Sequence, residues 1–284
     1  MFPANGKLRF ELLGVLRASR DGVHFNIGPP QQRVVLGVLL MHAGRPLSRE
    51  QIIEAVWGSA APSYAVNLVQ KYVSGIRRSL EPDRSGPAGP SLLTWTDAGY
   101  LLSTRSASLD LAEFDSGVER AAAARATGDL ETAARAIRGA LSLWRGPFCD
   151  GLTNPFLAAH RELLAERRIS LLEDRIEIDL AFGAGSEVVA ELRALVAAHP
   201  LRERLRGSLM IALYRSERQA EALAEFHEAH RYLRDELGIA PGTRLHHLYQ
   251  QILSSDADLV ASSVPRTPLP RYPRVPGGDT KWID

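Results

Sequence analysis

Six polar side chains follow one another at a spacing that places them on one side of an α-helix. They are Asn67, Gln70, Lys71, Ser74, Arg77 and Arg78. Amide side chains can form paired hydrogen bonds with adenine, and arginine or lysine with guanine, while serine and arginine also suit phosphate oxygens. The stripe contains no carboxylate before Glu81, although a solvated helix face usually mixes both signs of charge. These residue types favour recognition of a nucleic acid. A basic, solvated helix end, with its arginines near the C-terminal dipole, is the alternative.

The elements around this stripe decide between the two interpretations. The opposite side of the same segment is apolar, with Val69, Val73, Ile76 and Leu80 at helical spacing. Upstream, two strands are predicted over residues 7–19 and 22–27. Two helices follow them. The first begins at a proline and ends at Gly44, and the second begins with a capping box formed by Ser48 and Gln51. Downstream, the sequence around residues 97–99 predicts a β-hairpin. Strands, three helices and a terminal hairpin describe a winged helix.

In a winged helix the third helix is the one that can enter the major groove, which accepts a single helix. We therefore expect Asn67, Gln70, Lys71 and Arg77 to contact base edges. We expect Ser74 and Arg78 to contact phosphates, which position a protein without specifying a sequence.

The charge distribution agrees with this placement. The 284 residues carry a formal net charge of only +1, but residues 1–106 hold 12 lysines and arginines against 7 acidic residues. Residues 107–255 hold 18 against 22. We predict three parts: a basic winged-helix domain over residues 1–106, a helical domain over 107–255, and a disordered tail rich in proline, serine and arginine over 256–284. The fold class is mainly α with a small β part.

The helical domain contains repeated segments. Residues 128–143, 183–198 and 217–232 resemble one another, and the last two are offset by 34 residues, the tetratricopeptide period. In this alignment Ala190 matches Ala224 and Leu192 matches Phe226. Further helices are expected over residues 110–126 and 156–182. Stacked helix pairs of this kind offer a concave surface for a partner protein, and a scaffold that only dimerises is the alternative.

Several long stretches resemble the Streptomyces antibiotic regulatory protein family. Residues 28–58 and 67–80 are similar to its OmpR-type winged helix, and residues 141–148, 172–183 and 199–242 are similar to its bacterial transcriptional activation domain. The resemblance covers about residues 7–255. It implies a transcription activator that binds tandem direct repeats of promoter DNA, either as a homodimer or as side-by-side protomers. It also implies that the protein recruits RNA polymerase holoenzyme through the sigma factor and the alpha C-terminal domain. The controlled genes would form an antibiotic or other secondary-metabolite cluster.

The resemblance also suggests further contact residues. It places Thr96 in the wing as a DNA contact, although the family commonly has an arginine nearby and a basic residue in place of Gly75. These departures affect which base sequence is bound and leave the mode of binding unchanged. The loop before the third helix would face polymerase through Trp57, Gly58, Ser59, Ala60 and Ala61. Trp57 could instead be a core residue. We expect Tyr100 to be a core residue, and Trp95 is left open between wing and core.

No constellation for catalysis, metal binding or a cofactor is recognised. His227 and His230 lack the spacing of the zinc-protease motif, Cys149 is expected to be a free structural thiol, and no nucleotide-binding glycine loop occurs. The protein is thus not expected to be an enzyme. A single cysteine and the lack of a recognised signal peptide or membrane span favour a cytoplasmic, nucleoid-associated protein. The competing hypothesis is an adaptor whose helical repeats bind a ligand or peptide and whose winged helix makes protein contacts.

Overall fold

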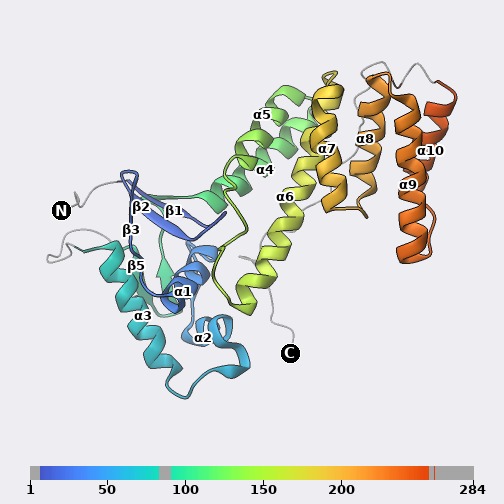
Figure 1. Cartoon of the computed structure of the whole chain (residues 1–284). Coiled ribbons are helices and arrows are strands. Elements are labelled where there is room, and N and C mark those ends of the chain that lie inside the picture. Colours follow the sequence, from blue (N-terminus) through green and yellow to red (C-terminus); the bar gives the residue numbers. More distant parts are fainter. Residues whose placement is uncertain (1–6, 83–90, 256–258, 260–284) are drawn as a thin grey trace. The chain divides into compact units, whose positions relative to one another are not determined.

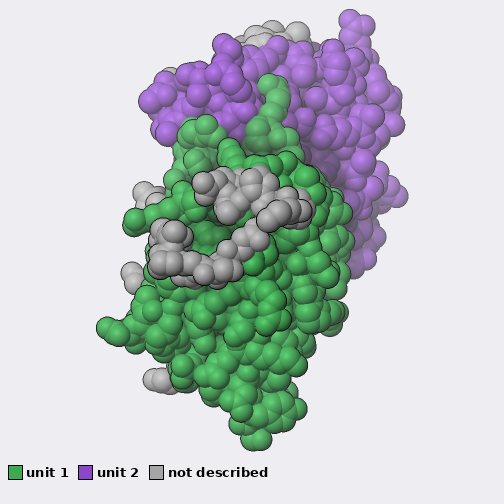
Figure 2. All heavy atoms as spheres, turned by 90° about the vertical axis from the view of Figure 1, so that its left-hand side faces the viewer, with its two compact units in different colours: residues 1–121, 138–168, 270–284 green, residues 122–137, 169–269 purple. Residues whose placement is uncertain are grey.

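The computed structural model describes residues 7–82, 91–255 and 259 (Figure 1). These residues form two compact units: residues 7–121 with 138–168, and residues 122–137 with 169–255 and 259 (Figure 2). The predicted fold class is confirmed, because a small β part precedes a long series of helices. The expected tail from residue 256 falls, except for Leu259, outside the described residues, as does most of the proline-rich stretch before the hairpin. The functional boundary at residue 106 stays a prediction.

The first unit begins with a four-stranded sheet. Its strands are β1 (Leu8–Glu11), β2 (Arg17–Arg20), β3 (Val23–Phe25) and β7 (Ala107–Leu109), in the order β3-β2-β1-β7. β1 pairs with β2 in antiparallel and with β7 in parallel orientation. The chain thus returns, after the hairpin, to the sheet with which it began.

The single strand expected over residues 7–19 is wrong, because the chain leaves the sheet between β1 and β2. Gly14 adopts φ 148°, a value that L side chains rarely adopt. The backbone N–H groups of Leu12 and Leu13 donate instead to the buried carboxylate of Asp110, at 2.8 and 3.0 Å. Burial raises the pKa of Asp110, while these hydrogen bonds and the guanidinium of Arg145 oppose the rise. One buried carboxylate therefore fixes the break.

The winged helix is present in the first unit. It consists of α1 (Pro30–Met41), α2 (Arg49–Trp57), α3 (Ala65–Leu80) and a sheet in the order β4-β6-β5. Its strands are β4 (Pro46–Leu47), β5 (Leu93–Thr96) and β6 (Gly99–Leu102). The predicted capping box is confirmed: the Gln51 N–H donates to Ser48 Oγ, and the Ser48 N–H donates to Gln51 Oε1. The predicted apolar side of α3 is also confirmed as core, since Val69, Val73, Ile76 and Leu80 are all buried.

The remaining helices are α4 (Asp110–Ala126), α5 (Leu130–Leu141), α6 (Pro155–Ala181), α7 (Ser186–Ala198), α8 (Glu203–Arg215), α9 (Gln219–Leu237) and α10 (Thr243–Leu253). Within the second unit, α7 packs on α8, α8 on α9, and α9 on α10. Leu192 and Phe226 are both buried in its core, and Ala190 and Ala224 are both exposed. The positions matched in the predicted alignment thus have equivalent burial, and the 34-residue repeat itself stays a prediction.

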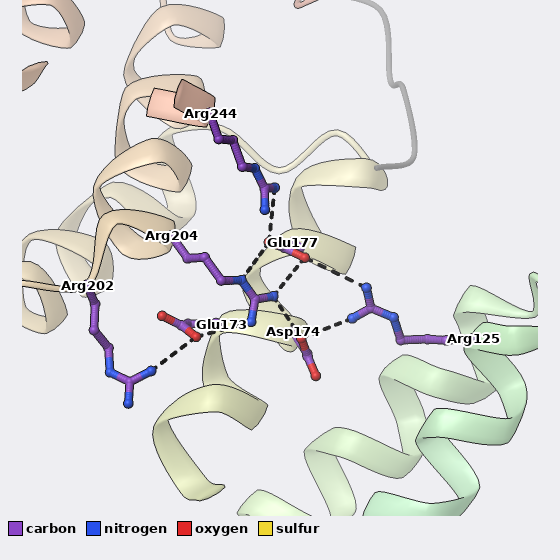
Figure 3. A network of polar contacts seen from close by, with 7 residues as sticks. All are labelled: Arg125, Glu173, Asp174, Glu177, Arg202, Arg204 and Arg244. Atoms are coloured by element: carbon purple, nitrogen blue, oxygen red, sulfur yellow. Dashed lines mark hydrogen bonds and ion pairs between the residues drawn. The ribbon is translucent and has the colours of Figure 1, made fainter. Parts of the chain in front are cut away.

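A charged cluster lies inside the second unit (Figure 3). Glu173, Asp174 and Glu177 of α6 are buried and pair with arginines that lie outside α6. Arg204 contacts all three carboxylates, at 2.8–3.1 Å. Burial raises the pKa of Glu173 and Asp174, and the arginines oppose this rise. For Arg204, burial acts to lower the pKa, but the three carboxylates outweigh it and raise the pKa. The cluster fixes α6 against α8, because the charge of Arg204 on α8 is paired with the carboxylates of α6.

Candidate nucleic-acid interface

The polar stripe of α3 faces solvent. Asn67, Gln70, Lys71, Ser74 and Arg78 are all exposed, while the opposite side of the helix is buried. The first turn of α3 carries no acidic residue, and its last turn carries two arginines. The stripe thus offers amide, hydroxyl and cationic groups on a surface whose backbone is held by the core beneath it.

Arg77 behaves differently from the other residues of the predicted stripe. Its side chain is half-buried, and its Nε donates to the carbonyl oxygen of Leu93 in β5 at 2.9 Å. The guanidinium carbon also lies 6.0 Å from the centre of the Tyr100 ring. Arg77 therefore connects α3 to the hairpin, and sequence periodicity alone could not have distinguished it from its exposed neighbours.

The first carboxylate after the stripe is directed to the hairpin. Glu81 accepts a hydrogen bond from the Leu92 N–H at 2.6 Å and others from Ser91 Oγ. At the same end of α3, the guanidinium of Arg20 donates to the Leu80 carbonyl oxygen. The Glu81 contacts fix the C-terminal end of α3 to the start of the hairpin, and the Arg20 contact fixes the same end to β2.

The hairpin carries an aromatic residue on its surface. The Trp95 side chain is 48% exposed, and the guanidinium carbon of Arg49 lies 4.3 Å from the centre of its ring. Tyr100 is buried, as predicted, and meets the Trp95 ring edge-on at 4.8 Å. Thr96, the predicted wing contact, is half-buried, and its hydroxyl donates to the Gly99 carbonyl oxygen at 3.0 Å. The Arg49–Trp95 pair was not found from sequence, because the two residues lie 46 positions apart.

Gly75 has a packing explanation. A Cβ atom at this position would lie 2.8 Å from Gln32 Cδ and closer still to Oε1. Gln32 is buried on α1, and its Nε2 donates to the Ile27 carbonyl oxygen at 2.9 Å. The glycine thus lets α1 and α3 approach each other around the amide. A basic residue here would require Gln32 to move.

The loop before α3 combines a fixed base with an exposed turn. Trp57 is half-buried and stacks on Tyr72 of α3, with ring centres 6.4 Å apart. Gly58–Ala60 form a 3₁₀ turn, in which Gly58 has φ 54° and ψ −136° and is half-buried. Ser59, Ala60 and Ala61 are exposed. Nδ2 of buried Asn154 donates to the carbonyl oxygens of the last turn of α2, at 3.0–3.2 Å.

The other chemically notable residues have packing surroundings. His227, His230 and His246 lie around Phe226, with ring centres 5.8–6.4 Å from it. Cys149 is buried, and burial raises the pKa of its thiol to about 12. Among the described residues, no group of three or more histidine, cysteine, aspartate or glutamate side chains is arranged to hold a metal ion. In the same part of the chain, no helix is both long and apolar enough to span a membrane.

Comparison with known proteins now identifies the family. Residues 28–102 match the model for "Transcriptional regulatory protein, C terminal", and residues 109–253 match that for "Bacterial transcriptional activator domain". The regulatory protein DnrI of Streptomyces peucetius is 33% identical over 254 residues, covering 88% of this chain and 93% of DnrI. This chain belongs to the Streptomyces antibiotic regulatory protein family. Its members are transcriptional regulators and not enzymes, and the expectation of an OmpR-type winged helix is confirmed.

Two further relatives extend the comparison. The regulatory protein AfsR of Streptomyces coelicolor is 43% identical over 267 residues, which are 92% of this chain and 26% of AfsR. The chain thus spans about a quarter of the length of AfsR. The structure of Mycobacterium tuberculosis EmbR in complex with a low-affinity phosphopeptide superposes with a TM-score of 0.81 and 35% identity, covering 90% of this chain and 68% of that one.

Proposed function

We propose that this family member activates transcription by binding promoter DNA through α3 and recruiting RNA polymerase. The observation that carries DNA binding is the exposed face of Asn67, Gln70, Lys71, Ser74 and Arg78, which combines amides and cations without a carboxylate. A major groove accepts such a helix, and these groups match base edges and phosphates. An adaptor that used the winged helix only for protein contacts would have no need for this composition.

Arg77 and Thr96 take supporting roles in the proposal. Both residues already bond within the winged helix, through Leu93 and Gly99 respectively. Arg77 would place the hairpin next to the groove that α3 occupies, and its other N–H groups would contact DNA from that fixed position. The exposed Trp95 of the hairpin, with Arg49 at the start of α2 against its ring, adds an aromatic and cationic pair beside α3's partner strand β5.

The proposed operator is a pair of direct repeats. A single DNA-binding module buries only about 600–1,000 Å² of protein surface, too little for high specificity in a genome. Two protomers side by side on tandem repeats would multiply that specificity. The resemblance to the family supports this arrangement of two protomers. It also supports the proposal that the controlled genes form a secondary-metabolite cluster. The protein would act in the cytoplasm, at the nucleoid.

The proposed polymerase contact is the turn after α2, toward the sigma factor and the alpha C-terminal domain. Ser59, Ala60 and Ala61 are exposed at its surface, while Trp57 stacks on Tyr72 beneath it. This division suits a contact loop, because the base is fixed and the small side chains leave room for a partner. Trp57 would therefore position the loop from within the winged helix, and its direct contact with polymerase would be the smaller part of its role.

The deciding experiment combines footprinting with transcription by purified polymerase. The full chain is footprinted on the upstream regions of neighbouring biosynthetic genes, and transcription is measured from each protected promoter. We expect protection of two direct repeats and stimulated transcription. We expect Ala60→Arg to keep the footprint and lower transcription, with the exposed Arg120→Ala, on α4, as a control that changes neither. Absence of any footprint at low salt would leave the adaptor hypothesis in place.

A further inference from the structure

A cavity opens within the second unit, and neither the DNA-binding face nor the polymerase loop uses it. It is lined by residues of α6, α8 and α10 and by Leu259, and it has a volume of about 660 Å³. Pockets that bind small molecules typically measure about 300–1,000 Å³ and are mostly apolar, with a few polar groups. Leu180, Ile211, Leu245 and Leu248 supply an apolar wall here.

The charged residues of the cavity are largely committed to one another. Arg204 and Arg244 contact Glu177, at 2.9 and 3.4 Å, as Figure 3 shows. Glu203 accepts a hydrogen bond from the Gly242 N–H at 2.8 Å. The two glutamates that line the cavity are thus already paired with internal donors.

Arg215 is the exception among the lining cations. Its Nη1 donates to the Leu180 carbonyl oxygen, and its Nε donates to the Leu259 carbonyl oxygen at 2.9 Å. Within the described part of the chain, Arg215 forms no ion pair with a carboxylate. A guanidinium has five N–H donors, so donors remain after these two bonds. Burial lowers the pKa of Arg215, as expected for a guanidinium that is partly removed from water.

We propose that this cavity binds a small organic anion with an apolar body. The acidic group would pair with the remaining donors of Arg215, and the apolar body would lie against Ile211, Leu245 and Leu248. Arg204 and Arg244 are already paired with carboxylates, so Arg215 is the lining arginine that can pair with the anion. The inference does not rest on DNA binding, because every residue it uses belongs to the second unit.

The test uses two fluorescent probes of similar shape and different charge. 1-Anilinonaphthalene-8-sulfonate carries an apolar ring system and a sulfonate, and N-phenyl-1-naphthylamine is its uncharged counterpart. We expect the full-length chain to bind one equivalent of the sulfonate saturably, and more tightly than the neutral probe. Decanoate is expected to displace the sulfonate, and decanol to displace it less well.

Variants assign the binding to this cavity. We expect Arg215→Gln to weaken sulfonate binding about tenfold or more, the value of a lost hydrogen bond between charged groups, while neutral-probe binding changes little. Gly207→Met extends a side chain toward Leu245 and Leu248, whose methyl groups lie 3.6–3.7 Å from a Cβ placed there, and is expected to weaken both probes. Arg231→Gln, at an exposed position of α9, is the charge-matched control and is expected to change neither.

Three results would overturn the proposal: no saturable sulfonate binding by the folded wild-type chain, equal losses in Arg215→Gln and Arg231→Gln, or unchanged binding in Gly207→Met. Circular dichroism and thermal unfolding of each variant separate loss of the site from loss of the fold. If Arg215→Gln does not fold, the Gly207→Met variant and the decanoate competition decide the question. DNA affinity, measured in parallel, is expected to be the same in all these variants.

Discussion

At the scale of single residues, the face of α3 divides into groups that are exposed and one that is bonded to the hairpin. Lys71 and Arg78 are exposed, whereas Arg77 donates to Leu93. Replacing Arg77 would therefore disturb the hairpin as well as any DNA contact. Lys71 and Arg78 are the cleaner positions at which to separate sequence recognition from phosphate contact.

We predict that Lys71→Ala weakens operator binding by about 1–3 kcal/mol and relaxes specificity at one base pair, because it removes a base contact. Arg78→Ala is expected to weaken binding to all sequences alike and to reduce the slope of log affinity against log salt by about 1. The measurement is fluorescence anisotropy over a salt series, with operator and scrambled DNA. Affinities identical to wild type in both variants at moderate salt would remove α3 as the recognition helix.

Gly75 illustrates what residue types alone cannot show. Its sequence context indicates only a cost in helix propensity, whereas in the structure the buried Gln32 amide occupies the space of its missing side chain. The decisive neighbour lies 43 positions away on another helix. No local pattern links the two residues.

We predict that Gly75→Ala destabilises the winged helix by about 1–3 kcal/mol, the usual cost of overpacking. In a Gln32→Ala background the same change is expected to stabilise it by up to about 1 kcal/mol, because only the helix-propensity gain remains. Urea denaturation of the four proteins of this cycle measures the sign change. Gly139→Ala on α5, where a Cβ would meet nothing within 4 Å, is the matched control and is expected to be stabilising. The same sign in both backgrounds would contradict the packing explanation.

At the scale of elements, sequence patterns predicted those features that depend on residues three or four positions apart. The Ser48–Gln51 capping box and the buried positions of α3 follow from spacings of three and four residues. The break between β1 and β2 could not be predicted, because it depends on Asp110, which lies 98 residues after Leu12. The charged cluster on α6 has the same character. Its three carboxylates look like an ordinary solvated helix face until the partner arginines are placed.

We predict that Arg204→Met destabilises the second unit by about 3–5 kcal/mol, because it removes the cation that contacts three buried carboxylates. Arg244→Met is the control: its side chain is 58% exposed and contacts Glu177 at 3.4 Å, so a loss of about 0–1 kcal/mol is expected. Hydrogen–deuterium exchange of α6 and α8 reports the difference. Equal protection in the two variants would contradict the central role of Arg204.

The loss of stability of the second unit in Arg204→Met is expected to depend on pH. Burial already raises the pKa of Glu173 and Asp174, and removing Arg204 raises the folded-state pKa further. A carboxyl whose pKa is higher in the folded than in the unfolded state binds its proton more tightly when folded. Stability therefore increases as the pH falls through the window between the ordinary and the raised pKa. The deficit of the variant is expected to shrink from neutral pH toward pH 5, and a deficit that grows over this range would contradict the assignment.

At the scale of the whole molecule, the order of elements and the family resemblance carried the prediction further than any single motif. A winged helix followed by stacked helix pairs was expected and is present. The compact units do not follow chain order, however, because parts of α4, α5 and α6 belong to each of them. A change of composition along the chain can mark a domain boundary only where each domain is one continuous stretch of sequence. It could not predict units that are assembled from several separate stretches. The cavity that contains Arg215 was missed for a related reason, since its lining comes from helices far apart in the chain.

The arrangement of two protomers on DNA is tested by the spacing of the operator repeats. Direct repeats about one helical turn apart, ~10–11 bp from centre to centre, place both protomers on the same face of the duplex, where they can contact each other. Inserting about 5 bp turns one site to the opposite face, and inserting a full turn restores the original face. We predict that the 5-bp insertion abolishes cooperative binding of the full chain, while the affinity for each isolated repeat is unchanged, and that the full-turn insertion recovers part of the cooperativity. Quantitative footprinting of the three operators measures both quantities. Cooperativity that is the same in all three operators would mean that the protomers bind independently, and the proposed side-by-side arrangement would be wrong.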